Sequence, residues 1–212
     1  MMIEIVQQFI PILWMGFLVN LEIGVAAVVI GVMLGVPLAL LRRRLPLLQR
    51  PIRLSVQLMQ ALPTYVTMFF VLNLLPDNLA LWGHPIRAVT AVVLAQSVYL
   101  TAYVAEDAHE ALEHLKRNER EQALLFLPNL LRGFVVVVMS SGFGAAVGVS
   151  EAVGVTMHQA ELYSALGDRV LVFGVTIIFF ALVFGSVNIL IQHLVRRLRQ
   201  PSLAPAAAGA AS

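Results

Sequence analysis

Long apolar runs, separated by short polar or basic segments, dominate the hydropathy pattern of this sequence. A helix needs about 20 mostly apolar residues to cross a hydrocarbon core of about 30 Å, and five runs meet this requirement. They fall within residues 10–41, 54–75, 88–105, 124–149 and 170–195. The pattern therefore predicts an all-α membrane protein with five transmembrane helices.

The composition supports a membrane protein and excludes several other classes. Hydrophobic residues make up 59% of the 212 residues and charged residues only 12%, whereas a soluble domain is about 25% charged. The mean hydropathy is +0.87. A net charge of +2 does not suit a nucleic-acid-binding protein, so no nucleic-acid partner is expected. The absence of cysteine excludes disulfides and thiolate chemistry.

Basic residues occur mainly in alternate connections between the apolar runs. Eleven of them follow the first, third and fifth runs, and the remaining connections and the N-terminal segment together hold two, with Arg132 unassigned. The eleven are Arg42, Arg43, Arg44, Arg50, Arg53, Lys116, Arg117, Arg120, Arg196, Arg197 and Arg199. Since cytoplasmic loops are enriched in Lys and Arg, we expect the N-terminus outside and the C-terminus in the cytoplasm. An odd number of spans agrees with that arrangement.

The two ends of the chain differ in character from the apolar middle. Residues 1–9 carry Glu4 and no basic residue, so they do not resemble a cleavable signal peptide. We expect residues 1–15 to be an extracytoplasmic lead-in and residues 16–199 to be the transmembrane permease domain. Residues 200–212 are rich in Pro, Ala and Ser, which predicts a disordered cytoplasmic tail.

A dense polar cluster lies at residues 106–114, just after the third run. His109 and His114 are five residues apart and therefore do not share a helix face. We interpret the cluster as a solvated amphipathic helix on the cytoplasmic side, with no metal site and no cofactor. No phosphate-binding G-x-x-x-x-G-K-[ST] loop occurs, so another chain must hydrolyse any ATP that is used. No catalytic residue is expected.

Some polar and special residues fall inside the apolar runs. Glu22 is the one carboxylate candidate within a span, and such groups are candidates for function. Pro63 is expected to kink or break the second span, as in helices that frame solute sites. Gly31 and Gly35 predict close helix packing. Uncharged polar residues either line a polar pathway or bond between helices: Gln57, Gln60, Asn73, Gln96, Ser97, Thr101, Asn188 and Gln192.

Several short segments occur in an order and spacing that resemble one family. They are residues 17–22 with 31–35, Gln60-Ala61-Leu62-Pro63 (compare R-G-T-P), residues 102–106 with 121–123 (compare A-Y-x-A-E and E-A-A), and residues 148–151 (compare G-V-P-E). Together they span about residues 16–199. The chain resembles a permease subunit of bacterial ABC importers for polar amino acids, which implies the type I ABC importer fold.

The resemblance implies a set of partners and residue roles. Such permeases work in pairs in the bacterial inner membrane, with two ATP-binding subunits and an extracytoplasmic solute-binding protein, in contact with membrane lipid. The E-A-A segment docks on the ATPase, which implies that Glu121, Gln122 and Ala123 couple to it. The translocation path is expected near Gln60, Pro63 and Thr64, with Glu22 as a further candidate.

The sequence also departs from the family pattern. Gln122 replaces the middle alanine of E-A-A, Gln60 replaces an arginine, and Leu127 or Pro128 stands where a glycine is expected. The coupling loop is shortened, with family residues missing before Phe134. We therefore expect a degenerate half of a heterodimer, a transport subunit without its own ATPase site. Two alternatives stay open: a stand-alone secondary transporter, or an accessory subunit that stabilises a partner.

Overall fold

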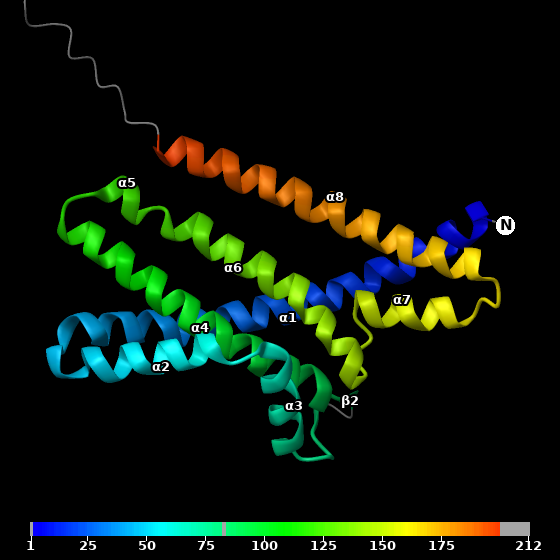
Figure 1. Cartoon of the computed structure of the whole chain (residues 1–212), viewed down its shortest axis with the longest axis horizontal. Coiled ribbons are helices and arrows are strands. Elements are labelled where there is room, and N and C mark those ends of the chain that lie inside the picture. The colour runs from blue at the N-terminus through cyan, green and yellow to red at the C-terminus, as the bar shows by residue number, and fades with distance from the viewer. Residues whose placement is uncertain (1, 82–83, 200–212) are drawn as a thin grey trace, which may run out of the picture.

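The computed structural model describes residues 2–81 and 84–199, and nearly all of these are helical (Figure 1). The longer helices are α1 (Met2–Arg44), α4 (Arg87–Lys116), α6 (Phe126–Ser140) and α8 (Leu166–Arg199). The shorter ones are η1 (Pro46–Leu48), α2 (Gln49–Ala61), α3 (Thr64–Leu74), α5 (Arg120–Ala123), η2 (Ser141–Val147) and α7 (Ala152–Glu161). Two-residue strands β1 (Ala80–Leu81) and β2 (His84–Pro85) pair antiparallel.

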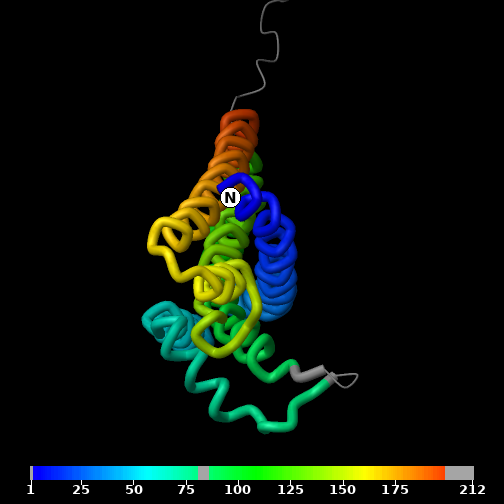
Figure 2. Tube along the Cα trace, turned by 90° about the vertical axis from the view of Figure 1, so that its right-hand side faces the viewer, coloured from blue at the N-terminus to red at the C-terminus, as the bar shows by residue number. Residues whose placement is uncertain are grey.

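The long helices confirm the predicted all-α membrane fold. Four segments of the described chain are long and apolar enough to cross a bilayer: α1, α4, the helical stretch Arg120–Val147, and α8. The helices η1 and α2 together with α3 pass the same test as a pair and are bent by 96°, so the described chain has five spans if this bent pair is counted as one broken span. The helices lie side by side along the long axis, and α3 turns away from them (Figures 1 and 2).

The basic segments gather at one end of the molecule. The connection from α1 to α2, the short helix α5 and the C-terminal end of α8 lie at the same end in Figure 1. The N-terminus, α7 and the start of α8 lie at the opposite end. This separation agrees with an N-terminus outside and a C-terminus in the cytoplasm. The tail predicted at residues 200–212 lies outside the described residues.

The second span breaks at the predicted proline. Helix α2 ends at Ala61, Leu62 is extended with φ −74° and ψ 120°, and Pro63 precedes the first residue of α3. A residue before proline avoids the helical region, and proline has no N–H to donate. The local chemistry of Leu62-Pro63 therefore accounts for the break between α2 and α3.

Helices α1 and α4 approach closely at the two predicted glycines. A Cβ atom added to Gly31 would lie 2.9 Å from Cβ of Leu100, and one added to Gly35 would lie 2.8 Å from the backbone oxygen of Thr101. Real Cβ atoms do not come that near. The small residues therefore allow the two backbones to pack against each other, as the sequence predicted.

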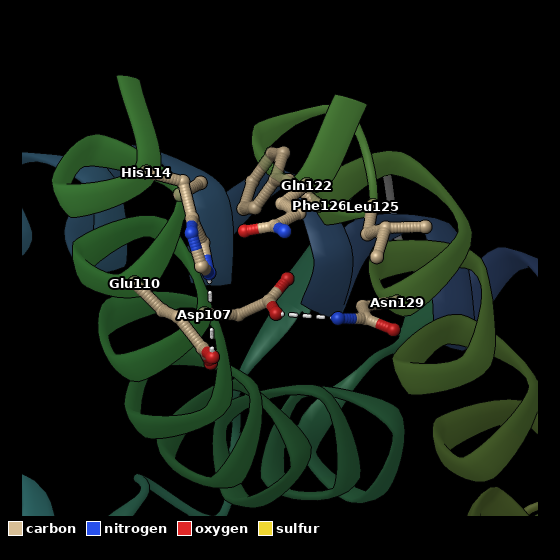
Figure 3. Close-up of a pocket in the computed structure, with 8 residues that line it drawn as sticks. Asp107, Glu110, His114, Gln122, Leu125, Phe126 and Asn129 are labelled. Carbon is tan, nitrogen blue, oxygen red and sulfur yellow. Dashed lines mark hydrogen bonds and ion pairs between the residues drawn. The ribbon is translucent and has the colours of Figure 1, made fainter. Parts of the chain in front are cut away.

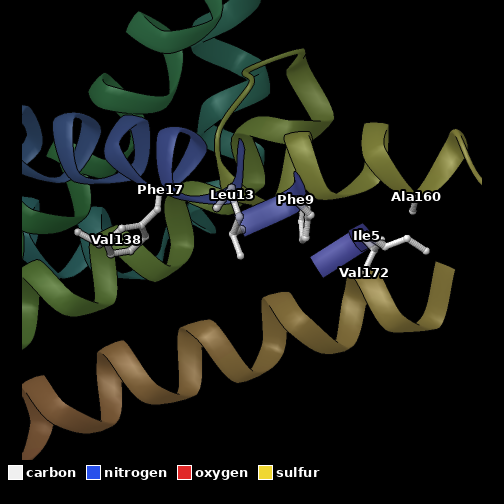
Figure 4. Packing of buried hydrophobic residues seen from close by; sticks show 8 residues of the cluster. Ile5, Phe9, Leu13, Phe17, Val138, Ala160 and Val172 are labelled. Carbon is white, nitrogen blue, oxygen red and sulfur yellow. The ribbon is translucent and has the colours of Figure 1, made fainter. Parts of the chain in front are cut away.

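The N-terminal residues of α1 belong to the hydrophobic core. Ile5, Phe9, Leu13 and Phe17 recur every four residues and pack against α6, α7 and α8 (Figure 4). This spacing places all four on one helix face. Residues 2–15 thus continue the same helix as the span, and the domain boundary expected at residue 15 stays a prediction.

Candidate translocation surface and coupling segment

Helix α2 carries a packed face and two exposed faces. Ile52 and Val56 are buried against Ala102 and Ala105 of α4. The exposed residues of α2 lie on two sides of this buried face, because successive residues of a helix are rotated by about 100° around its axis. One side is polar and one is apolar, so the packing against α4 fixes which side chains of α2 remain free.

The polar side of α2 is a stripe of four exposed residues: Arg50, Arg53, Gln57 and Gln60. They recur at intervals of three and four residues and span about 80° of the helix circumference. None of them makes a hydrogen bond or ion pair with the described part of the chain. We call these four residues the α2 polar stripe.

The other exposed side of α2 is apolar. Leu54, Leu58 and Leu62 are between 52% and 59% exposed. Lipid tails accept leucine but leave amides and guanidinium groups without partners. The leucine side therefore suits lipid, whereas the polar stripe requires water or a polar neighbour. A polar face of this kind in a span is typical of a translocation path.

The structure brings three of the four predicted path residues together at the helix break. Gln60 ends the polar stripe, Pro63 is exposed, and Thr64 is the half-buried first residue of α3. Glu22 is separate from them, on an exposed face of α1. It lies about 30 Å along the helix from Arg42, which places it near the outer interface. The roles of all four residues stay predictions.

The predicted coupling residues form a single turn of helix at the basic end of the molecule. Within α5, the side chains of Glu121 and Gln122 are exposed and that of Ala123 is 8% exposed. Ala123 borders an apolar hollow with Leu112, Leu115 and other residues of α1, α4 and α6. Glu121 and Gln122 are thus accessible at the surface, while Ala123 anchors α5.

Polar contacts tie α5 and its neighbours to α4 (Figure 3). Asn129 of α6 donates to Asp107 Oδ1 at 2.7 Å, and the hydroxyl of Tyr103 donates to the backbone oxygen of Asn129 at 3.0 Å. His114 Nδ1 lies 2.7 Å from Glu119 Oε2. Asp107, His114 and Asn129 line a pocket of about 70 Å³ that Gln122 also lines. The cluster predicted as a solvated helix is thus the end of α4, and its side chains hold the α5 connection.

A buried polar network, for which the sequence indicated no role, joins α1 to the start of α7. Asn20 donates to Ser141 Oγ at 2.8 Å and to Glu151 Oε2 at 2.9 Å, and accepts from the backbone N–H of Ala152 at 2.9 Å. Asn20, Ser141 and Glu151 are 0% exposed. Glu151 also caps α7, accepting from the N–H groups of Val153 and Gly154 at 2.8 Å.

Burial raises the pKa of the Glu151 carboxyl above its ordinary value, and the N–H donors around it oppose that shift. The residues at 148–151 were noticed in the sequence only as a family resemblance. Asn20 lies 131 positions from Glu151, so no local pattern connects the two. An asparagine inside an apolar run was the one available signal.

These features define a class of protein: a multi-pass membrane protein with a polar surface along a broken helix. Residues 27–126 match the family described as "Binding-protein-dependent transport system inner membrane component". The chain is also 23% identical to the probable glutamine ABC transporter permease protein GlnP of Bacillus subtilis, over 91% of this chain and 94% of that protein.

Two solved structures share the fold over nearly their whole length. One is the crystal structure of an amino acid ABC transporter with histidines, at a TM-score of 0.67 and 19% identity, covering 90% of this chain and 95% of that one. The other is an inward-facing MetNI methionine ABC transporter, at 0.66 and 13%, covering 91% and 99%.

Together, the family match over residues 27–126 and the relative support a permease component of a binding-protein-dependent ABC importer, and the two solved structures show that the chain shares the fold of ABC importer permeases. Permeases of this family carry no ATPase site of their own, so the resemblance implies ATP-binding subunits and a partner permease. The predicted resemblance is thereby confirmed.

Proposed function

We propose that this chain forms half of the translocation path of an importer for polar amino acids in the bacterial inner membrane. The α2 polar stripe, exposed and unpaired beside a helix break, carries this proposal. A polar solute that passes a bilayer needs hydrogen-bonding groups along its path, and Gln57 and Gln60 supply amides there. The names of the similar transporters support amino acids as the solute class.

The coupling segment α5 is the contact proposed for the ATP-binding subunit. Glu121 and Gln122 are exposed at the basic end, while Ala123 is anchored against α4. Movement of α5 would reach α4 through His114 and Glu119, whose side chains are 2.7 Å apart. The solute-binding protein would dock at the opposite end. The altered E-A-A segment favours a heterodimer in which the second permease supplies an intact coupling segment.

Replacing Glu121 and Gln122 together with alanine should weaken the hold of the ATP-binding subunit on the complex. Losing these two exposed polar side chains of α5 is expected to reduce the co-purified ATP-binding subunit about tenfold, equivalent to about 1.4 kcal/mol. The amount retained in detergent is measured by quantitative gel or mass spectrometry. The Glu161→Ala variant, an exposed glutamate on α7 at the other end, is the control and should retain the parent amount.

Equal retention in the double variant and in Glu161→Ala would contradict the coupling role of α5. Recovery of the chain without any ATP-binding subunit would contradict it more broadly. If transport by the assembled complex persists after this chain is removed, the chain is an accessory subunit that stabilises its partner. Solute uptake by the chain alone in liposomes, without ATP, would instead show a stand-alone transporter.

Replacing Gln57 and Gln60 with leucine should abolish most transport and leave ATP binding intact. The change turns the half of the polar stripe next to the helix break apolar, so a polar solute loses its partners within the membrane. Uptake of labelled glutamine by the reconstituted complex with its solute-binding protein is expected to fall at least about tenfold. Leu58→Met, on the apolar side of α2, is the matched control and should transport normally. Normal uptake in the variant with both Gln57→Leu and Gln60→Leu would rule out a translocation path along the α2 polar stripe.

A further inference from the structure

A cleft of about 470 Å³ lies between α6 and α8 and belongs to neither the polar stripe nor the coupling segment. Its principal lining residues are Arg132, Val136, Met139, Phe184, Asn188 and Ile191. Its volume is within the usual range for ligand sites, about 300 to 1,000 Å³. The cleft is therefore large enough to hold part of a lipid molecule.

The cleft is polar at one end and apolar at the other. Arg132 lies about 9 Å along α6 from its start at Phe126, and Asn188 lies about 12 Å along α8 from Arg196. Both are therefore at a similar distance from the basic end of the molecule. Met139 and Phe184 lie further from that end. The cleft thus carries both of its polar side chains near the cytoplasmic surface, beside Ile191, and only apolar side chains deeper in the membrane.

The charge at the polar end has no acidic partner among the described residues. Arg132 is exposed, and its one hydrogen bond in the described chain is to Asn129 Oδ1, at 3.3 Å. Asn188 is also exposed and makes no hydrogen bond with the described residues. A guanidinium inside a span is normally paired or reaches a head group. The site therefore calls for an anionic group from outside this chain.

We infer that this cleft binds an anionic phospholipid of the cytoplasmic leaflet. Its phosphate lies against Arg132 and Asn188, and an acyl chain lies along Val136, Met139 and Phe184. Basic pockets between transmembrane helices on the cytoplasmic side bind anionic head groups in this way. The mostly apolar lining suits an acyl chain better than a polar amino acid. This inference is independent of which solute the importer carries.

The test measures the lipid that stays bound to the purified complex with its ATP-binding and partner subunits. The complex is exchanged into a mixture of phosphatidylglycerol and phosphatidylcholine, and bound lipid is quantified by mass spectrometry. Arg132→Gln is expected to lower the retained phosphatidylglycerol about fivefold, the value for one basic contact of about 1 kcal/mol. Phosphatidylcholine should not change. Arg117→Gln, an exposed arginine outside the cleft, should behave as the parent.

Two further variants keep the test decisive. Arg132→Lys preserves the charge and should retain most of the phosphatidylglycerol, while Met139→Trp should fill the apolar part and displace lipid without removing the arginine. Equal phosphatidylglycerol in Arg132→Gln and in the parent would overturn the inference. Equal loss of both lipids in Arg132→Gln would also overturn it. A photo-crosslink from position 139 to the second permease, rather than to lipid, would assign the cleft to the subunit interface instead.

Discussion

Replacing Gly35 with alanine should strongly destabilise the folded chain. The new Cβ atom would lie 2.8 Å from the backbone oxygen of Thr101 and 2.8 Å from Cβ of Val104. Neither atom is the end of a flexible side chain, so α1 and α4 must move apart. Overpacking of this kind costs roughly 3 kcal/mol, which corresponds to a fall of about 6 to 12 °C in melting temperature.

The matched control for this variant is Gly174→Ala on α8. A Cβ atom at Gly174 meets nothing within 4 Å, so this change should be neutral or slightly stabilising. Thermal stability is measured in detergent by the fraction of chain that stays monodisperse on size exclusion after heating. Similar melting temperatures for the two variants would show that α1 and α4 tolerate separation at Gly35. In that case close packing against α4 would not explain the glycines of α1.

The features that the sequence predicted correctly depend on local chemistry. Apolar length identifies a span wherever it occurs, and the missing N–H of Pro63 breaks a helix without help from distant residues. The clustering of arginine in alternate connections likewise depends on position along the chain alone. Helix ends were less accurate: the first apolar run was placed at residues 10–41, whereas α1 is Met2–Arg44. Its additional turns are stabilised by packing against α7 and α8.

The candidate sites were predicted only in part because they depend on which helix faces become covered. Arg53 was counted as a loop cation, but α2 begins at Gln49 and carries Arg53 on its polar stripe. The free side of α2 is known only once Ile52 and Val56 are seen against α4. Arg132 was left unassigned because it falls near the start of a predicted span, and the cleft that it lines needs Phe184 and Asn188 of α8, more than fifty residues further along the chain.

Replacing Asn20 with leucine is expected to cost roughly 3 kcal/mol of stability, because it disrupts a fully buried network. The Glu151 carboxylate and Ser141 would each lose a hydrogen-bond donor, and the N–H of Ala152 would lose its acceptor. Leucine has nearly the same size as asparagine but offers no polar atom. The connection between α1 and the start of α7 should therefore loosen, which is measured by melting temperature and by proteolysis near residue 150.

The effect of this variant should depend on pH in a direction fixed by Glu151. Burial raises the folded-state pKa of Glu151 above its unfolded value, so the folded chain binds more protons and stability falls as pH rises between the two values. Asn20 lowers that pKa by donating to the carboxylate, and its loss raises the folded-state pKa further. The stability gap between variant and parent should therefore be larger at about pH 8 than at about pH 5.

Asn73→Leu separates this specific effect from the general loss of an amide. Asn73 is exposed on α3 and donates only to the backbone oxygen of Phe69 in its own helix, so its replacement should change stability little at either pH. A gap for Asn20→Leu that is constant with pH would show that Glu151 keeps its charge state without Asn20. In that case the N–H groups of Val153 and Gly154 alone would be sufficient to hold the carboxylate, and Asn20 would contribute packing rather than charge stabilisation.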